Sequence, residues 1–139
     1  MQNTLPQQEL NTLMHAAAAD AIKYAADEHQ LTLDNSVDSL HQLDILLGTL
    51  HQREQQQRHS AELVFTLCNI VGAYVGELFI AHVGGQWQQS QTDNNAPFVF
   101  VQFNDKEFPF ASVCYHKITQ DNTISLANYM KQAMANAMQ

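Results

Sequence analysis

The pattern of apolar and polar positions predicts two amphipathic helices near the N-terminus. In residues 8–29 and 37–55, apolar side chains recur every three or four positions, which is typical of a helix with one buried face. The first stripe consists of Leu10, Leu13, Met14, Ala17, Ala21 and Tyr24 or Ala25. The second consists of Leu40, Leu43, Leu47 and Leu50. The short stretch 31–33 between them fits an extended conformation.

The third predicted helix is the most apolar part of the chain. Ser60 is a suitable N-cap residue, and the helix runs from there to about residue 81. Gly84 and Gly85 end it, because glycine readily adopts the positive φ found after helix ends. Residues 63–83 are long enough to cross a bilayer, but Glu77 is costly to place in one. We therefore expect a buried central helix.

After residue 85 the pattern changes from helical to extended. Residues 86–89 and 98–103 are predicted strands, and turn residues follow at 92–95 and 104–106. Residues 108–118 are also expected to be extended. Asn122 or Thr123 leads into a last helix, whose apolar side consists of Ile124, Leu126, Ala127, Met130 and Met134. The predicted fold is α+β, with three N-terminal helices, an antiparallel sheet of three to four strands and a C-terminal helix.

Length and charge narrow the classes of function. A chain of 139 residues is expected to form a single domain, 1–139. It carries 14 acidic and only 6 basic residues, a net charge of −8. Too few Lys and Arg are present to neutralise phosphates, which disfavours nucleic acid and anionic membrane surfaces. An acidic surface suits a basic partner protein.

The cysteines and the N-terminus favour the cytoplasm. Cys68 and Cys114 have no CxxC or zinc-type spacing, so we interpret them as small buried apolar side chains. The N-terminus lacks the basic and apolar regions of a secretory signal. The sequence predicts no cofactor and no metal site. Asp38, His41 and Asp44 share one helix side, but this spacing is common on helix surfaces.

Candidate functional residues gather in the third helix. Asn69 and Glu77 lie on one face, and Gly72 and Gly76 lie on an adjoining stripe. Glycine inside a helix costs about 1 kcal/mol relative to alanine, so two of them indicate that a neighbour packs close. That neighbour is either another element of the fold or a ligand in the notch that the glycines form.

Glu77 has three open interpretations. It is a buried carboxylate held by backbone donors or a tyrosine hydroxyl, an exposed residue at a helix end, or a general base or metal ligand. No Ser, Cys or Lys stands at a spacing that completes a catalytic set with it. We therefore predict no catalytic residues and no enzyme. Trp87, the only tryptophan, is expected to anchor the first strand in the core, with an exposed binding role as the alternative.

Two motifs carry a resemblance to a known group of proteins. They are Gly72-Ala73-Tyr74-Val75-Gly76-Glu77 and Gly84-Gly85-Gln86-Trp87. Together they resemble a pattern in small uncharacterised bacterial proteins, in which a Gly-x-Tyr-x-Gly-Glu helix runs into a Gly-Gly-x-Trp strand. The resemblance covers roughly residues 31–120. It implies a role for some members as immunity or accessory proteins of toxin systems, and it implies no catalytic residues.

These observations leave three hypotheses. The first is a non-enzymatic, cytoplasmic bacterial domain that binds another, basic, protein. The second is a small-molecule binder or hydrolase with a pocket near Gly72, Gly76 and Glu77. The third is a structural homodimer that associates through the Phe-rich strand or an apolar helix. The residues singled out as a structural or possible ligand notch are Asn69, Gly72, Tyr74, Gly76, Glu77 and Trp87.

Overall fold

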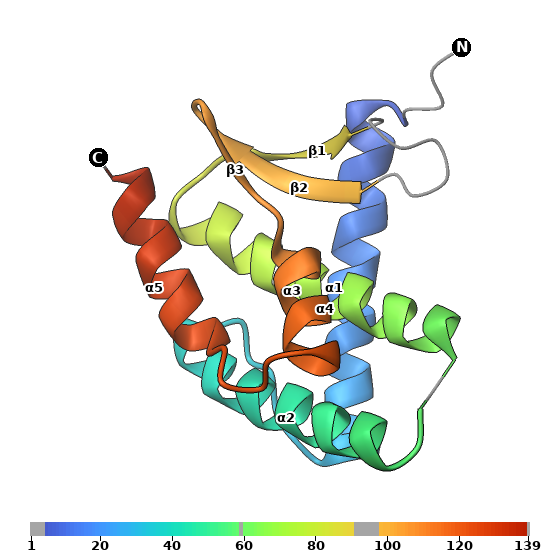
Figure 1. The fold of residues 1–139 in the computed structure, drawn as a ribbon. Coiled ribbons are helices and arrows are strands. Elements are labelled where there is room, and N and C mark those ends of the chain that lie inside the picture. Colours follow the sequence, from blue (N-terminus) through green and yellow to red (C-terminus); the bar gives the residue numbers. More distant parts are fainter. Residues whose placement is uncertain (1–4, 59, 91–97, 139) are drawn as a thin grey trace.

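The computed structural model describes residues 5–58, 60–90 and 98–138. In this part of the chain it contains five α-helices, one 3-10 turn and a three-stranded antiparallel sheet, which confirms the α+β class. The helical elements are α1 (Gln7–His29), η1 (Val37–Ser39), α2 (Leu40–Gln56), α3 (Ala61–His82), α4 (Phe110–Thr119) and α5 (Leu126–Ala137). The strands are β1 (Gln86–Ser90), β2 (Phe98–Phe103) and β3 (Lys106–Phe108). The sheet lies at one end of the helices, above α3 (Figure 1).

The stripes predicted for the first two helices form much of the core. All four leucines of the α2 stripe are buried. In α1 the buried face is shifted from the predicted one, and Leu13 is exposed. The residues that α1 buries are Leu10, Met14, Ala18, Ala21 and Ala25. The three alanines have small side chains, which lets α1 pack closely along α3, with which it makes the most extensive helix contact.

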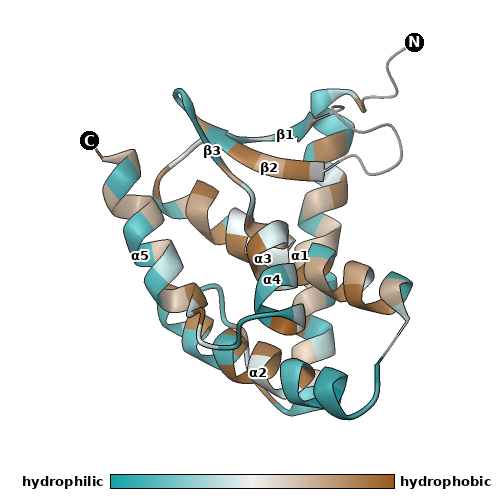
Figure 2. Cartoon of the chain, viewed as in Figure 1, coloured by the Kyte–Doolittle hydropathy of each residue, from teal (hydrophilic) through white to brown (hydrophobic). Residues whose placement is uncertain are grey.

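The central helix α3 is the apolar axis of the molecule. Ser60 caps it as predicted, accepting the backbone N–H of Leu63 at 3.1 Å. By length and composition α3 could span a membrane, while most of it is buried within the fold. Figure 2 shows hydrophobic residues concentrated on α3 and β2, in contrast to the hydrophilic last turns of α2.

A glycine pair turns the chain from α3 into the sheet. Gly84 and Gly85 have φ values of +123° and +98°, which confirms their predicted positive φ. β1 then pairs with β2 and β2 with β3, both antiparallel. Trp87 lies opposite Val101, and Val101 opposite Phe108. All three side chains are buried, so this face of the sheet covers the helices.

The region after the sheet differs from the prediction. Residues 108–118 were expected to be extended, but β3 ends at Phe108 and α4 occupies 110–119. Aromatic residues alternate at 108 and 110, which resembles a strand, yet Pro109 lies between them and serves as the N-cap position of α4. The side chains that α4 buries follow a helical spacing: Phe110, Cys114, Lys117 and Ile118. The fold therefore has two helices after the sheet, not one.

The stretch 31–33 belongs to the connection between α1 and η1 and is not part of the sheet. One smaller prediction is corrected. The last helix begins at Leu126 and is capped by Ser125, so Ile124 precedes the helix instead of lying on its apolar side. The Ser125 hydroxyl accepts the backbone N–H of Asn128 at 3.2 Å. The turn predicted at 92–95 lies outside the described residues.

Candidate functional site

Glu77 lies at the meeting point of α1, α3 and β1. Its Oε1 is 3.0 Å from Nδ1 of His15 on α1, and its Oε2 accepts the indole N–H of Trp87 on β1 at 3.3 Å. The Glu77 side chain is 28% exposed and that of His15 is 84% exposed. The carboxylate is therefore held by an indole and an imidazole, rather than by backbone donors or a tyrosine hydroxyl.

Trp87 covers Gly76 and brings its indole to Glu77. The tryptophan is only 3% exposed, as expected for a core anchor of β1. A Cβ atom on Gly76 would lie 2.1 Å from Cη2 of the ring, a distance that no side chain tolerates. Glycine at this position thus lets the six-membered part of the Trp87 ring pack against α3, and the indole Nε1 reaches the carboxylate of the next residue, Glu77.

Gly72 serves a similar purpose one turn earlier. A Cβ atom on Gly72 would lie 2.6 Å from Cα of Ala111, so the backbone of α4 occupies this space. The notch that the two glycines form is accordingly filled by Trp87 and α4. Asn69 is half-buried one turn before Ala73 on α3 and is not among the residues that line the groove described below.

Tyr74, the other polar member of the motif, points away from Glu77. Its buried hydroxyl accepts the backbone N–H of Asn35 at 2.9 Å and lies 2.6 Å from Oγ of Ser39. These bonds fix the connection between α1 and α2 to the central helix. The structure thus brings Gly76, Glu77 and Trp87 together and places Tyr74 in a separate structural contact.

A groove of about 420 Å³ opens beside Glu77. The residues that line it are Asn11, Thr12, His15, Glu77, Ile80, Gly85, Gln86 and Trp87. Glu77 is the single carboxylate among these residues, and no Lys or Arg is among them. Gln7 joins two of its walls, since its side-chain amide donates to the Trp87 carbonyl at 2.8 Å. The groove therefore presents one carboxylate among apolar and polar side chains that include no Lys or Arg.

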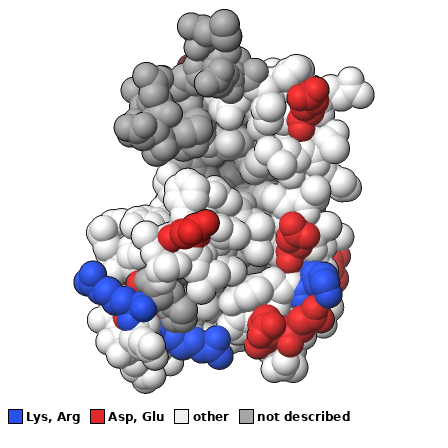
Figure 3. Space-filling view, turned by 90° about the vertical axis from the view of Figure 1, so that its right-hand side faces the viewer, with Lys and Arg blue, Asp and Glu red and all other residues white. Residues whose placement is uncertain are grey.

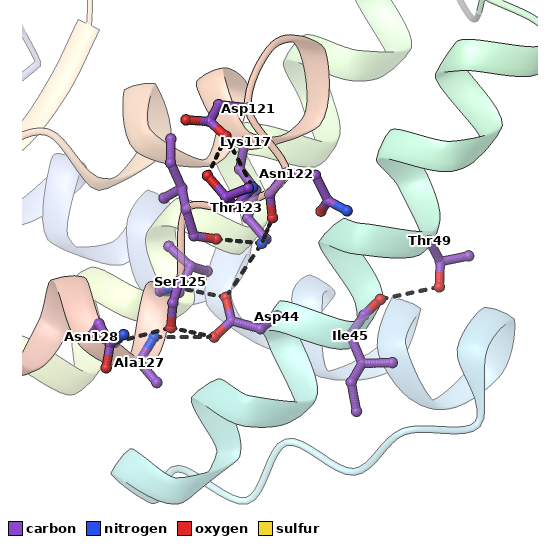
Figure 4. Close-up of polar contacts among 12 residues, drawn as sticks. Asp44, Ile45, Thr49, Lys117, Asp121, Asn122, Thr123, Ser125, Ala127 and Asn128 are labelled. Atoms are coloured by element: carbon purple, nitrogen blue, oxygen red, sulfur yellow. Dashed lines mark hydrogen bonds and ion pairs between the residues drawn. The ribbon is translucent and has the colours of Figure 1, made fainter.

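A second carboxylate, Asp44 on α2, is engaged in a different way (Figure 4). It accepts the backbone N–H groups of Leu126 and Ala127 at 2.6 and 3.2 Å and the Ser125 hydroxyl at 3.1 Å. Nζ of Lys117 lies 3.8 Å away. Asp44 thus satisfies the first turn of α5, where helical N–H groups lack partners and a negative charge is favourable.

Lys117 completes this cluster from α4. Its side chain is 5% exposed, and Nζ donates to the carbonyls of Asn122 and Ile124. These bonds hold the connection between α4 and α5. The predicted stripe of Asp38, His41 and Asp44 is divided in the structure. Asp38 in η1 and His41 on α2 are exposed, whereas Asp44 bonds the first turn of α5. Within the described residues, no group of three or more His, Cys, Asp and Glu side chains is arranged to hold a metal ion.

The two cysteines are buried free thiols. Burial raises the pKa of Cys68 to about 12, and burial is also the main reason that the pKa of Cys114 lies well above its usual value. Because the thiolate is the nucleophilic form, neither cysteine is activated for chemistry at neutral pH.

Sequence reasoning missed His15 and the groove residues of α1. His15 and Glu77 are 62 positions apart, and no spacing in the sequence connects them. Lys117 was missed because its segment was interpreted as extended. The signal was present in this case, since Phe110, Cys114 and Lys117 recur at helical spacing.

Comparison of the chain with protein-family models, curated proteins and solved structures gave no match.

Proposed function

We propose that this chain is a non-enzymatic, cytoplasmic bacterial domain that binds a basic partner protein. The observation that carries the proposal is the groove beside Glu77, which holds one oriented carboxylate and has no basic side chain other than His15 among its lining residues. A protein surface with this arrangement complements a positively charged side chain of a partner.

The charge of the whole molecule supports the same partner. The net charge of −8 attracts a basic protein over distances of about a Debye length, and this attraction raises the association rate. Figure 3 shows one face of the molecule. In the part of that face which the structure describes, carboxylates occur from top to bottom, whereas Lys and Arg occur only in the lower part.

We further propose a role as an immunity or accessory protein of a toxin system. This part rests on the resemblance of residues 72–77 and 84–87 to small bacterial proteins. Four residues of these motifs line the groove, namely Glu77, Gly85, Gln86 and Trp87, and Gly76 lies against the Trp87 ring. The resemblance thus falls on the residues that build the proposed binding surface.

The proposal is tested by capture of a partner from the source bacterium. An affinity-tagged chain is used as bait, and a captured protein is purified separately and mixed with the chain to measure direct binding. We expect a basic protein whose affinity decreases as salt increases, because the attraction between opposite charges is screened. In parallel, neighbouring genes that inhibit growth are co-expressed with the chain. The absence of both a direct partner and any rescue of growth contradicts the proposal.

A second candidate function is a small-molecule binder or hydrolase that uses the same groove. The observation that favours it is the contact between His15 and Glu77, since a carboxylate that orients an imidazole is also a common arrangement for a general base. Incubation with a panel of ester, amide and phosphoester substrates tests this function. Turnover that is lost in both His15→Ala and Glu77→Gln supports it, and turnover that persists in both variants contradicts it.

A further inference from the structure

We propose that the groove beside Glu77 binds an arginine side chain of the partner protein. This inference rests on the proposed function and names the chemical group that the site recognises. Three features of the groove lead to it: the unused hydrogen-bonding capacity of the carboxylate, its fixed orientation, and the mixture of apolar and neutral polar walls.

The carboxylate of Glu77 retains acceptor sites on both oxygens. An ionised carboxylate has about four lone-pair positions, two on each oxygen. In the structure His15 approaches Oε1 and the indole of Trp87 donates to Oε2. One position on each oxygen thus remains for a guest. A guanidinium group fills such a pair with two parallel N–H···O bonds, which is its preferred contact with a carboxylate.

The orientation of the carboxylate is set before the guest arrives. Glu77 follows Gly76 in the buried central helix, and the Trp87 ring that bonds Oε2 is held against Gly76 in the core. A guest therefore meets a carboxylate whose rotamer is already restricted, which reduces the entropy lost on binding. His15 is largely exposed and can move aside without disturbing the core.

The walls of the groove suit the rest of an arginine side chain. Ile80 and the edge of Trp87 provide an apolar surface for its methylene groups. Thr12 and Gln86 line the groove as neutral polar residues, and the Thr12 hydroxyl already donates its proton to the Gln8 carbonyl, which leaves its oxygen as an acceptor. Arginine has five N–H donors in a planar fork, whereas the lysine ammonium is a compact charge that cannot bond both oxygens in this way.

The single tryptophan makes this inference directly measurable. Its indole N–H is bonded to the carboxylate in question, so the one indole signal in a ¹H–¹⁵N spectrum reports on Glu77. The probes are N-acetyl-arginine methylamide and its lysine and citrulline counterparts. We expect a saturable shift of the indole signal with arginine, weaker binding of lysine, and no saturable shift with uncharged citrulline, which has nearly the same shape as arginine.

Matched variants assign the effect to Glu77. Glu77→Gln keeps the shape and an acceptor for the indole but removes the charge, and we expect it to weaken arginine binding by about tenfold, the loss of roughly 1.4 kcal/mol expected for one charge-assisted contact. Glu62→Gln removes an exposed charge from the first turn of the same helix, outside the groove, and should bind arginine as the wild type does. The inference is wrong if citrulline binds as well as arginine, or if Glu77→Gln binds arginine normally.

The captured partner separates the failure of this inference from the failure of the proposed function. A partner that binds the wild type and Glu62→Gln equally, but binds Glu77→Gln at least about tenfold more weakly, supports both the arginine site and the proposed function. If the partner binds all three proteins equally, the domain binds proteins through another surface and this inference is overturned. If no partner is found but the indole signal still responds only to arginine, the result supports arginine binding in the groove and contradicts the proposed function.

Discussion

Two carboxylates on core helices, Asp44 and Glu77, show how the same chemical group serves two different purposes in this molecule. Asp44 on α2 accepts two backbone N–H groups and a hydroxyl, and Lys117 balances its charge. Glu77 on α3 has one side-chain contact on each oxygen and borders a groove. The two groups have similar exposure, 20% and 28%, so burial alone does not distinguish them.

The difference lies in what surrounds each carboxylate. At Asp44 the donors are parts of α4 and α5, so the bonds join elements of the fold. At Glu77 one donor is the core residue Trp87, and the other is the exposed residue His15. A carboxylate saturated by the backbone is architectural, whereas one with remaining acceptor sites beside a groove is available to a guest.

The largest effect is expected at Trp87, which supports the groove from the core. Trp87→Ala removes a ring that is 3% exposed and should lower the free energy of unfolding by about 3–5 kcal/mol. Urea denaturation followed by circular dichroism measures the loss. A loss below about 1 kcal/mol would mean that the ring contributes little to the core. In that case Glu77 would not have the rigid support described above.

Gly72→Ala tests the close packing of α3 on α4. The new Cβ would lie 2.6 Å from the Ala111 backbone, so we expect the overpacked site to cost about 1–3 kcal/mol. Gly48→Ala on α2 is the control, because its Cβ would make an ordinary contact 3.4 Å from Oδ1 of Asn122. There the better helix propensity of alanine should leave stability unchanged or increase it. Equal melting temperatures for the two variants would contradict the packing at Gly72.

Asp44→Ala tests whether the first carboxylate is architectural. The loss of the bonds to α5 should cost about 2 kcal/mol, the upper part of the range for helix caps, because Lys117 also loses its counter-charge. Asp20→Ala, at an exposed position on α1, is the control and should change stability by no more than about 0.5 kcal/mol. Hydrogen exchange should be faster in α5 of Asp44→Ala. Unchanged exchange in α5 would contradict the assigned role.

Glu77→Gln tests the second carboxylate by the same measurement. The amide oxygen can still accept the indole N–H, so we expect a loss in the free energy of unfolding below about 1 kcal/mol. This variant should therefore be more stable than Asp44→Ala while losing affinity for the arginine probe. The comparison between the two carboxylates breaks down if Glu77→Gln proves the less stable of the two.

The smallest effect is expected at the thiols. Burial raises the pKa of Cys68 to about 12 and raises that of Cys114 well above its usual value, so almost no thiolate is present at pH 8. We expect iodoacetamide to leave the folded protein unmodified at pH 8 and to label both cysteines in urea. Mass spectrometry counts the added groups. Rapid labelling of the native protein would show that one of these side chains opens to solvent.

The sequence was most informative where one face of an element determines its structure. Leu40, Leu43, Leu47 and Leu50 correctly indicated the buried side of α2, and Gly84 and Gly85 correctly marked the end of α3. It was misleading at α4, where aromatic residues on both sides of Pro109 resembled a strand. The buried residues Phe110, Cys114 and Lys117 do recur at helical spacing, whereas the packing of α4 against α3 at Gly72 is visible only in the structure.

The sequence by itself determined that Glu77 stands in an apolar helix next to a glycine, and that a tryptophan follows a glycine turn. These facts predict an unusual carboxylate and a core aromatic residue, because local spacing and the cost of burial can be deduced without coordinates. Only the tertiary structure decided that Trp87 bonds Glu77, that His15 approaches from α1, and that a groove lies between them. Contacts between residues as far apart as 62 positions depend on how helices pack, and no pattern along the chain records that packing.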